Sequence, residues 1–378
     1  QVEGGEGIPM LCVDGVSVRE LAAQYGTPCY VYSQTRVQQN CVRLQEAFRG
    51  RCDFFYAIKA CCNPAVAACV LTTEGWEFGV DAASANEILL ARGRLGRRPD
   101  QVLFSGNNLS HHDIQVALEQ GVIFNLDDIS LLGKVLEHGV PDLVCFRVNP
   151  GVGESGVGDW VLNAGPKAKF GLSPDQVLGA FQQAQKAGIR RFGVHMMCGS
   201  CNLRPAYFAE ITNRLLDLVG NVSRDLGIQF EFIDLGGGLG IPYRPWEEDS
   251  LPVQELADLV CDVFDRKCQE YGLDPPPRMA MEPGRYLVGD AGFLIGEVQT
   301  IKRGFSTGGD APAVPLVGTN IGMNVLARPA MYQAYHHIYF DGYELGGKAL
   351  PHGFAGLSAV VPDVAATQQQ QQQQQQEE

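Results

Sequence analysis

The sequence predicts an α/β fold in which a (β/α)₈ barrel of the TIM type carries a second, β-rich domain. Three observations predict it: apolar segments alternate with helix-like ones between residues 52 and 285, polar residues follow the apolar segments, and both chain ends lack the alternation. The chain has 378 residues. That length exceeds what one hydrophobic core normally organises, so a large domain with a smaller one is the natural division.

Eight apolar segments are the candidate barrel strands. They are Asp53–Ala57, Trp76–Val80, Val102–Phe104, Val122–Asn125, Leu143–Val148, Phe192–His195, Phe230–Leu235 and Arg278–Met281. Helix-like segments lie between most of them, such as Ser84–Arg92, where Ser84 is a candidate N-cap and Glu87 follows three residues later. Pro205–Leu218 is another. Eight such repeats in about 230 residues fit a barrel over residues 33–290.

Alternation alone does not separate a closed barrel from an open, doubly wound sheet, but the placement of polar residues favours the barrel. A barrel gathers its active site at the C-terminal ends of its strands. The residues found at or just after these ends are Lys59, Asp81, Asn107, Arg147, His195, Gly236 and Glu282.

The two chain ends, residues 1–32 and 291–345, are expected to form the β-rich domain. Strand-like pieces such as Gly296–Ile301 and Val314–Val317 occur there without alternating helices. Residues 346–378 are predicted to be a divergent tail. It ends in the glutamine run Gln368–Gln376, which buries too little apolar surface to become ordered.

Composition excludes several classes of function. The formal net charge is −14 and no Lys/Arg-rich run occurs, which argues against nucleic-acid binding. No apolar stretch is long enough to span a bilayer. Twelve cysteines are scattered along the chain, which is typical of a reducing compartment. Cys198 and Cys201 form a lone C-x-x-C without further ligands at zinc spacing, so we expect no metal site.

Four segments carry candidate chemistry. Lys59 in YAIKA directly follows a strand, where burial lowers the pKa of an amine and prepares it for Schiff-base formation. The glycine run from Gly236 offers backbone N–H groups to a phosphate, and its spacing is not that of a dinucleotide fingerprint. Glu282 in EPGR is placed to keep a pyridine nitrogen protonated. His195 precedes Ser200 in an H-x-x-x-G-S run.

Taken singly, each segment also fits a bland interpretation: a solvated lysine, a tight turn, a surface ion pair or a structural histidine. Their order is more specific. Together they resemble the fold-type III pyridoxal-phosphate decarboxylases, whose barrel is like that of alanine racemase. Within that group the chain is most similar to the diaminopimelate decarboxylases, through GMNVLARPAMY from Gly322 to Tyr332.

The resemblance implies a role for each matching residue. Lys59 would form the Schiff base with pyridoxal 5′-phosphate, and His195 would stack on the ring. The other implied cofactor contacts are Ser200, Gly237, Gly238, Glu282, Gly284 and Arg285. The implied contacts to the carboxylates of the substrate are Arg285, Arg328 and Tyr332. The implied reaction is decarboxylation of meso-2,6-diaminopimelate to L-lysine by a homodimer.

One departure from the family pattern affects the expected activity. The family carries a Cys-Glu segment near its C-terminus, given to the partner's site, and a late tyrosine. Neither follows Phe340, and no cysteine lies beyond Cys268. We therefore expect an incomplete β-rich domain, with cofactor binding kept and turnover weak or absent.

Two alternatives stay open at this point. One is decarboxylation of ornithine or arginine, which Arg328 disfavours because a guanidinium repels a cationic substrate end. The other is a catalytically silent regulatory homologue. The expected compartment is the cytoplasm or the plastid stroma.

Overall fold

The computed structural model describes residues 2–3, 10–155, 164–244, 246–302, 316–339 and 341. The chain divides into two compact units. One comprises residues 34–291, and the other combines residues 1–33 with 292–378. The predicted tail, residues 346–378, lies outside the described residues.

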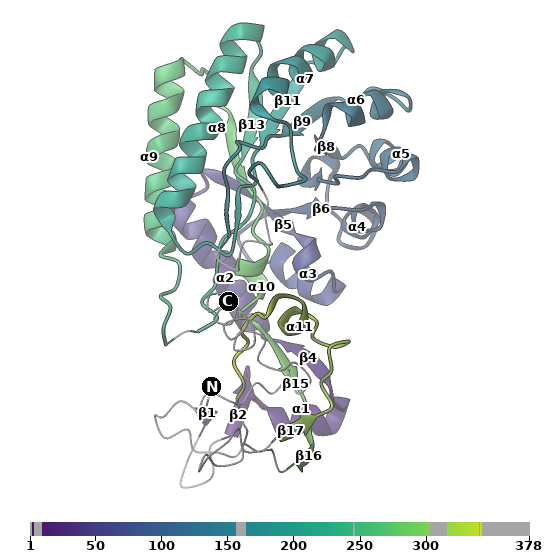
Figure 1. The fold of residues 1–378 in the computed structure, drawn as a ribbon, viewed down its shortest axis with the longest axis vertical. Coiled ribbons are helices and arrows are strands. Elements are labelled where there is room, and N and C mark those ends of the chain that lie inside the picture. The colour runs from purple at the N-terminus through teal and green to yellow at the C-terminus, as the bar shows by residue number, and fades with distance from the viewer. Residues whose placement is uncertain are drawn as a thin grey trace, which may run out of the picture. The chain divides into compact units, whose positions relative to one another are not determined.

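Residues 34–291 form a closed barrel of eight parallel strands surrounded by helices (Figure 1). The strands, in barrel order, are β5 (Cys52–Ala57), β6 (Phe78–Ala82), β7 (Val102–Phe104), β8 (Ile123–Leu126), β9 (Leu143–Arg147), β11 (Arg191–His195), β13 (Phe230–Asp234) and β14 (Arg278–Met281). β14 pairs with β5, where Ala280 lies opposite Asp53, and this pairing closes the barrel. The predicted barrel is confirmed, and the open doubly wound sheet is excluded.

Helices follow the strands and cover the outside of the barrel (Figure 1). They are α2 (Gln34–Phe48), α3 (Pro64–Leu71), α4 (Ala85–Leu89), α5 (His111–Gln120), α6 (Ile129–Leu136), α7 (Pro174–Lys186), α8 (Pro205–Leu226), α9 (Val253–Tyr271) and α10 (Arg285–Val288). Short 3₁₀ turns cover Ile58–Ala60 and Pro99–Gln101. The two-residue strands β10 (Glu154–Ser155) and β12 (Gly199–Ser200) pair beside the barrel.

The helix predicted over Ser84–Arg92 shows how local chemistry sets an end. Ser84 is the N-cap, since its side chain accepts the N–H of Glu87. The Glu87 carboxylate accepts the N–H of Ala83 at 2.6 Å. The α-helical part ends at Leu89 and continues as a π-helical turn over Leu90–Arg94, which apolar periodicity alone does not predict.

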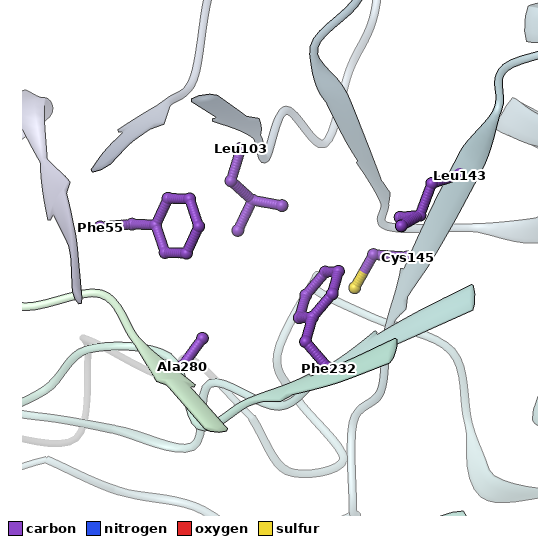
Figure 2. Close-up of a cluster of buried hydrophobic side chains, with 6 residues drawn as sticks. All are labelled: Phe55, Leu103, Leu143, Cys145, Phe232 and Ala280. Carbon is purple, nitrogen blue, oxygen red and sulfur yellow. The ribbon is translucent and has the colours of Figure 1, made fainter. Parts of the chain in front are cut away.

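The barrel interior is filled by large side chains from alternate strands (Figure 2). The buried cluster consists of Phe55, Leu103, Leu143, Cys145, Phe232 and Ala280. Five of its six members come from β5, β7, β9 and β13, every second strand of the barrel, which is the layering expected of this fold. The interior is therefore packed, and the chemistry is left to the rim.

The second unit is β-rich and contains both chain ends, as predicted. β4 (Cys29–Tyr32) pairs with β15 (Gly292–Ile295), and β16 (Val298–Lys302) pairs with β17 (Leu316–Thr319). The remaining strands are β1 (Val2–Glu3), β2 (Met10–Val13) and β3 (Val16–Ser17). Two short helices, α1 (Val18–Tyr25) and α11 (Arg328–Tyr332), also form there. Ser17 caps α1 by accepting the N–H of Arg19.

Candidate active site

Every strand of the barrel delivers a polar side chain at or just beyond its C-terminal end. In barrel order these are Lys59, Asp81, Ser105, Asn125, Arg147, His195, Asp234 and Glu282. Since the strands are parallel, these residues share one mouth of the barrel. The residue after β7 that contacts Glu282 is Ser105. A part for Asn107 in the site stays a prediction.

Lys59 lies in the 3₁₀ turn that follows β5 and reaches the neighbouring strand. Its Nζ is 2.5 Å from Oδ2 of Asp81. The Asp81 side chain is fully buried, whereas that of Lys59 remains 57% exposed. The lysine is thus held at its charged end and still faces open space, as a nucleophile at a ligand site must.

The expectation that Lys59 has a lowered pKa is wrong. Burial does lower it, but attraction to Asp81 and Glu282 outweighs burial and raises the pKa to about 12. The sequence conceals this because the two carboxylates come from other strands, β6 and the end of β14.

Glu282 is a buried carboxylate at the centre of a hydrogen-bonded group. Its Oε2 lies 3.2 Å from Nε2 of His195, and its Oε1 lies 3.5 Å from the hydroxyl oxygen of Ser105. Asn125 donates to that hydroxyl at 3.0 Å. Burial raises the pKa of Glu282, but the attraction of His195, Lys59 and Arg147 outweighs burial and lowers the pKa to about 2. Glu282 is therefore an anion at neutral pH.

Two more carboxyl groups near Glu282 titrate in the opposite direction. Burial, followed by repulsion from Glu282, raises the pKa of Asp81 and raises that of Asp234 well above its usual range. The charge of Glu282 therefore shifts the titration of both neighbouring carboxyl groups. Arg147 lies at the end of β9. Its Nε is 3.8 Å from Oδ1 of Asp127, and its Cζ lies over the ring of Phe170, 4.2 Å from the ring centre.

The glycine run after β13 makes a cradle that side chains would fill. Gly236 and Gly238 have φ of +68° and +95°, which favour glycine. A Cβ on Gly237 would lie 2.4 Å from the carbonyl oxygen of Glu282, and one on Gly238 would lie 2.6 Å from that of Gly199. Ser200 directly follows Gly199, so the structure brings this predicted phosphate contact beside the cradle. Among the described residues, the N–H of Gly237 meets only the weak acceptor Met197 Sδ, at 3.1 Å.

Gly284 and Arg285 border the lysine and the glycine run. A Cβ on Gly284 would lie 3.0 Å from Cβ of Ala57 and 3.1 Å from that of Ala60, so the EPGR loop packs against the Lys59 turn. The Arg285 guanidinium donates to the hydroxyl of Tyr243, which lies just beyond the glycine run.

This arrangement fits pyridoxal phosphate at both of its ends. At the ring end, Asp81 Oδ1, Asn125 Oδ1 and His195 Nδ1 are buried and have no hydrogen-bond partner among the described residues. At the other end, the glycine cradle offers backbone N–H groups to a phosphate.

His195, Asp234 and Glu282 also have metal-ligand spacing, each with one ligand atom within 4.8 Å of the others. Their packing against the glycine cradle favours the organic cofactor. The prediction that the protein binds no metal stays a prediction.

Arg328 and Tyr332 belong to the second unit, where they begin and end α11. Nη1 of Arg328 lies 3.1 Å from Nε2 of His336. Their predicted contact with the substrate stays a prediction.

Sequence reasoning missed several residues of the site. Asp81 and Arg147 were recognised only as strand-end residues, and Ser105, Asp127 and Asp234 received no role. The usable signal was the same for all of them: a polar residue at the end of an apolar strand.

Comparison with known proteins decides the family. The profile described as "Pyridoxal-dependent decarboxylase, pyridoxal binding domain" matches residues 34–289. A diaminopimelate decarboxylase from Methanothermobacter thermautotrophicus is 41% identical over 332 residues, which cover 87% of this chain and 74% of the relative. The chain belongs to the diaminopimelate decarboxylase family. A second family member, from Thermoplasma acidophilum, is 36% identical over 89% of this chain and 78% of its own length.

Solved structures agree with this family assignment. The diaminopimelate decarboxylase of M. jannaschii in complex with L-lysine superposes with a TM-score of 0.74 at 32% identity, covering 89% of this chain and 76% of that one. Among the described residues of this family member, no helix is both long and apolar enough to cross a membrane.

Proposed function

We propose that the chain is a carboxy-lyase that decarboxylates meso-2,6-diaminopimelate to L-lysine with pyridoxal phosphate. One observation carries the proposal: Lys59, Asp81 and Glu282 meet beside a glycine cradle in a barrel of the pyridoxal-dependent decarboxylases. The relatives named diaminopimelate decarboxylase support the substrate, and the structure solved with L-lysine supports the product.

The barrel residues are assigned to the cofactor by their chemistry. Lys59 would provide the amine that holds the cofactor aldehyde, and His195 would lie against the ring. Ser200, Gly237 and Gly238 receive the phosphate. When bound, pyridoxal phosphate supplies an electron sink for the electron pair left on Cα as carbon dioxide departs.

Charge determines how the residues serve that reaction. Glu282 is ionised throughout the working range of pH, so it can hold a proton on a ring nitrogen. Asp81 holds the protonated amine of Lys59, which places a proton donor at the mouth of the barrel. Both functions follow from side chains fixed by strands, so little reorganisation is needed.

We assign the carboxylates of the substrate to Arg285, Arg328 and Tyr332. Gly284, next to Arg285, is assigned to the cofactor. Diaminopimelate has a carboxylate at each end, and a guanidinium binds such a group in two-pronged fashion. A cationic distal end, as in ornithine or arginine, lacks this partner. The alternatives of another amino-acid substrate and of a silent homologue are not favoured.

We also propose a homodimer in a reducing compartment, the cytosol or the plastid stroma. All twelve cysteines are free thiols, which supports the compartment. The L-lysine complexes of the relatives support an amino acid as the small-molecule partner.

A substrate panel tests the function. Protein loaded with pyridoxal phosphate receives meso-diaminopimelate, L-ornithine or L-arginine, and chromatography quantifies the amine products. We expect L-lysine from diaminopimelate and no product from the other two. Arg328→Ala should weaken binding of diaminopimelate roughly tenfold to 150-fold, the value of one charge-assisted bidentate contact. Product from ornithine, or unchanged diaminopimelate binding in the variant, contradicts the assignment, and the measured rate tests the expectation of weak turnover.

A further inference from the structure

Asp234 is a buried carboxyl group for which the proposed reaction has no role. It ends β13, directly before the glycine run, and is 0% exposed. Its Oδ1 accepts the N–H of Gly236 at 2.8 Å. Its Oδ2 has no hydrogen-bond partner in the described part of the chain. A buried, unpartnered polar atom is costly, so its presence calls for a functional reason.

The bonded oxygen acts on the phosphate end of the site. The Asp234–Gly236 hydrogen bond closes a tight turn that holds Gly236 at a φ of +68°. Further along the run, the carbonyl of Gly238 accepts the N–H of Asn202 at 2.9 Å. Between these two anchors lies Gly237, whose N–H has only a sulfur acceptor in the described part of the chain and is available for a phosphate oxygen. Asp234 is thus the side-chain anchor at the start of the cradle.

The same carboxyl group also borders the ring end. One of its oxygens lies within 4.8 Å of a ring nitrogen of His195 and of a carboxylate oxygen of Glu282. The other groups that bear on its titration are Asp81 and Lys59. With Glu282 already an anion, a second charge on Asp234 would have no cation bonded to it, which favours the protonated form. Burial and then repulsion from Glu282 raise its pKa accordingly.

We propose that Asp234 is a positioning residue: its Oδ1 holds the N–H of Gly236 and so sets the glycine run for the phosphate of the cofactor. The inference rests on the proposed function, because it presumes that pyridoxal phosphate is the ligand. It assigns Asp234 to the phosphate end of the cofactor and leaves the ring nitrogen to Glu282.

The test compares two probes on three variants of the full chain. The probes are pyridoxal phosphate and pyridoxal, which lacks the phosphate, each titrated by absorbance. Asp234→Ala removes the acceptor and should weaken pyridoxal phosphate about tenfold while changing pyridoxal less than about twofold. Asp234→Asn and Asp234→Ser keep a neutral oxygen within reach of the N–H two residues on. Both should bind pyridoxal phosphate within about threefold of wild type.

Asp217→Ala is the matched control, since Asp217 bonds Lys267 and Tyr271 on the outer helices and is not part of the site. In this variant, the ratio of the affinity for pyridoxal phosphate to that for pyridoxal should equal the wild-type ratio. Equal loss of both probes in Asp234→Ala would overturn the proposal, because Asp234 would then act on the ring. A tenfold loss in Asp234→Asn would also overturn it, because charge would then be required. If the alanine variant does not fold, the affinities of the asparagine and serine variants for pyridoxal phosphate still test the proposal. Failure of wild type to bind pyridoxal phosphate contradicts the proposed function itself.

Discussion

At the scale of single residues, Lys59 shows what sequence can and cannot predict. Its place after an apolar strand identified it as the nucleophile candidate. Its charge state could not be predicted from the sequence, because Asp81 and Glu282 lie near Lys59 only when β6 and β14 pair with β5. The balance of one desolvation effect against two attractions, which raises the pKa to about 12, is a property of the assembled barrel.

The raised pKa of Lys59 predicts a pH dependence for cofactor attachment. Only the neutral amine attacks an aldehyde, so the attachment rate should rise about tenfold per pH unit below pH 12. Asp81→Asn removes the nearest anion while burial still lowers the pKa of the lysine. The rate profile should therefore move to lower pH by about one unit or more, as measured by stopped-flow absorbance.

Asp127→Asn is the control for that experiment, because Asp127 faces Arg147 and makes no contact with Lys59. Its profile should stay with that of wild type. A profile of Asp81→Asn that coincides with wild type would show that Asp81 does not set the charge of the lysine.

At the scale of elements, apolar patterns predicted each of the eight barrel strands, and the pairing between strands set their exact limits. Asp81 was expected just beyond its strand, yet it pairs with Ala57 as part of β6. Trp76, expected to begin that strand, lies outside it. Pairing partners fix these limits, and a single chain segment carries no information about its partner. The role of Asp234 depends on the same pairing, which sets His195 opposite it.

Barrel packing predicts a stability difference between two glycine substitutions. A Cβ on Gly193 of β11 would lie 2.4 Å from the ring of Phe232, so Gly193→Ala should cost about 1–3 kcal/mol of unfolding free energy. Gly179 lies within α7 with nothing within 4 Å of its Cβ position. Gly179→Ala should therefore stabilise by about 0.5–1 kcal/mol.

Urea unfolding followed by circular dichroism measures both changes. The midpoint should fall for Gly193→Ala and rise for Gly179→Ala at similar slopes. A Gly193→Ala variant as stable as wild type would mean that Phe232 does not occupy the barrel interior as described.

At the scale of the whole molecule, the sequence predicted which segments form the barrel and which form the β-rich unit. The alternation of apolar and helix-like segments indicated the barrel, and its loss at both ends indicated the β-rich unit. Side-chain contacts tie the ends of that unit together: the N–H of Leu11 bonds Asp341 at 3.0 Å, and Tyr30 donates to the carbonyl of Val325 at 2.7 Å. The helices α1 and α11 escaped prediction because they are short, eight and five residues, and carry little periodic signal.

The central claim, that this barrel holds pyridoxal phosphate on Lys59, is tested most directly by locating the attachment. Protein incubated with pyridoxal phosphate is reduced with borohydride, digested and mapped by mass spectrometry. Lys169→Ala serves as the control, because Lys169 lies near Arg147 over the ring of Phe170 but makes no contact with Asp81. We predict one pyridoxyl group on the peptide that contains Lys59, retained in Lys169→Ala and absent in Lys59→Ala. A modified peptide elsewhere in the chain, or none at all, would contradict the account.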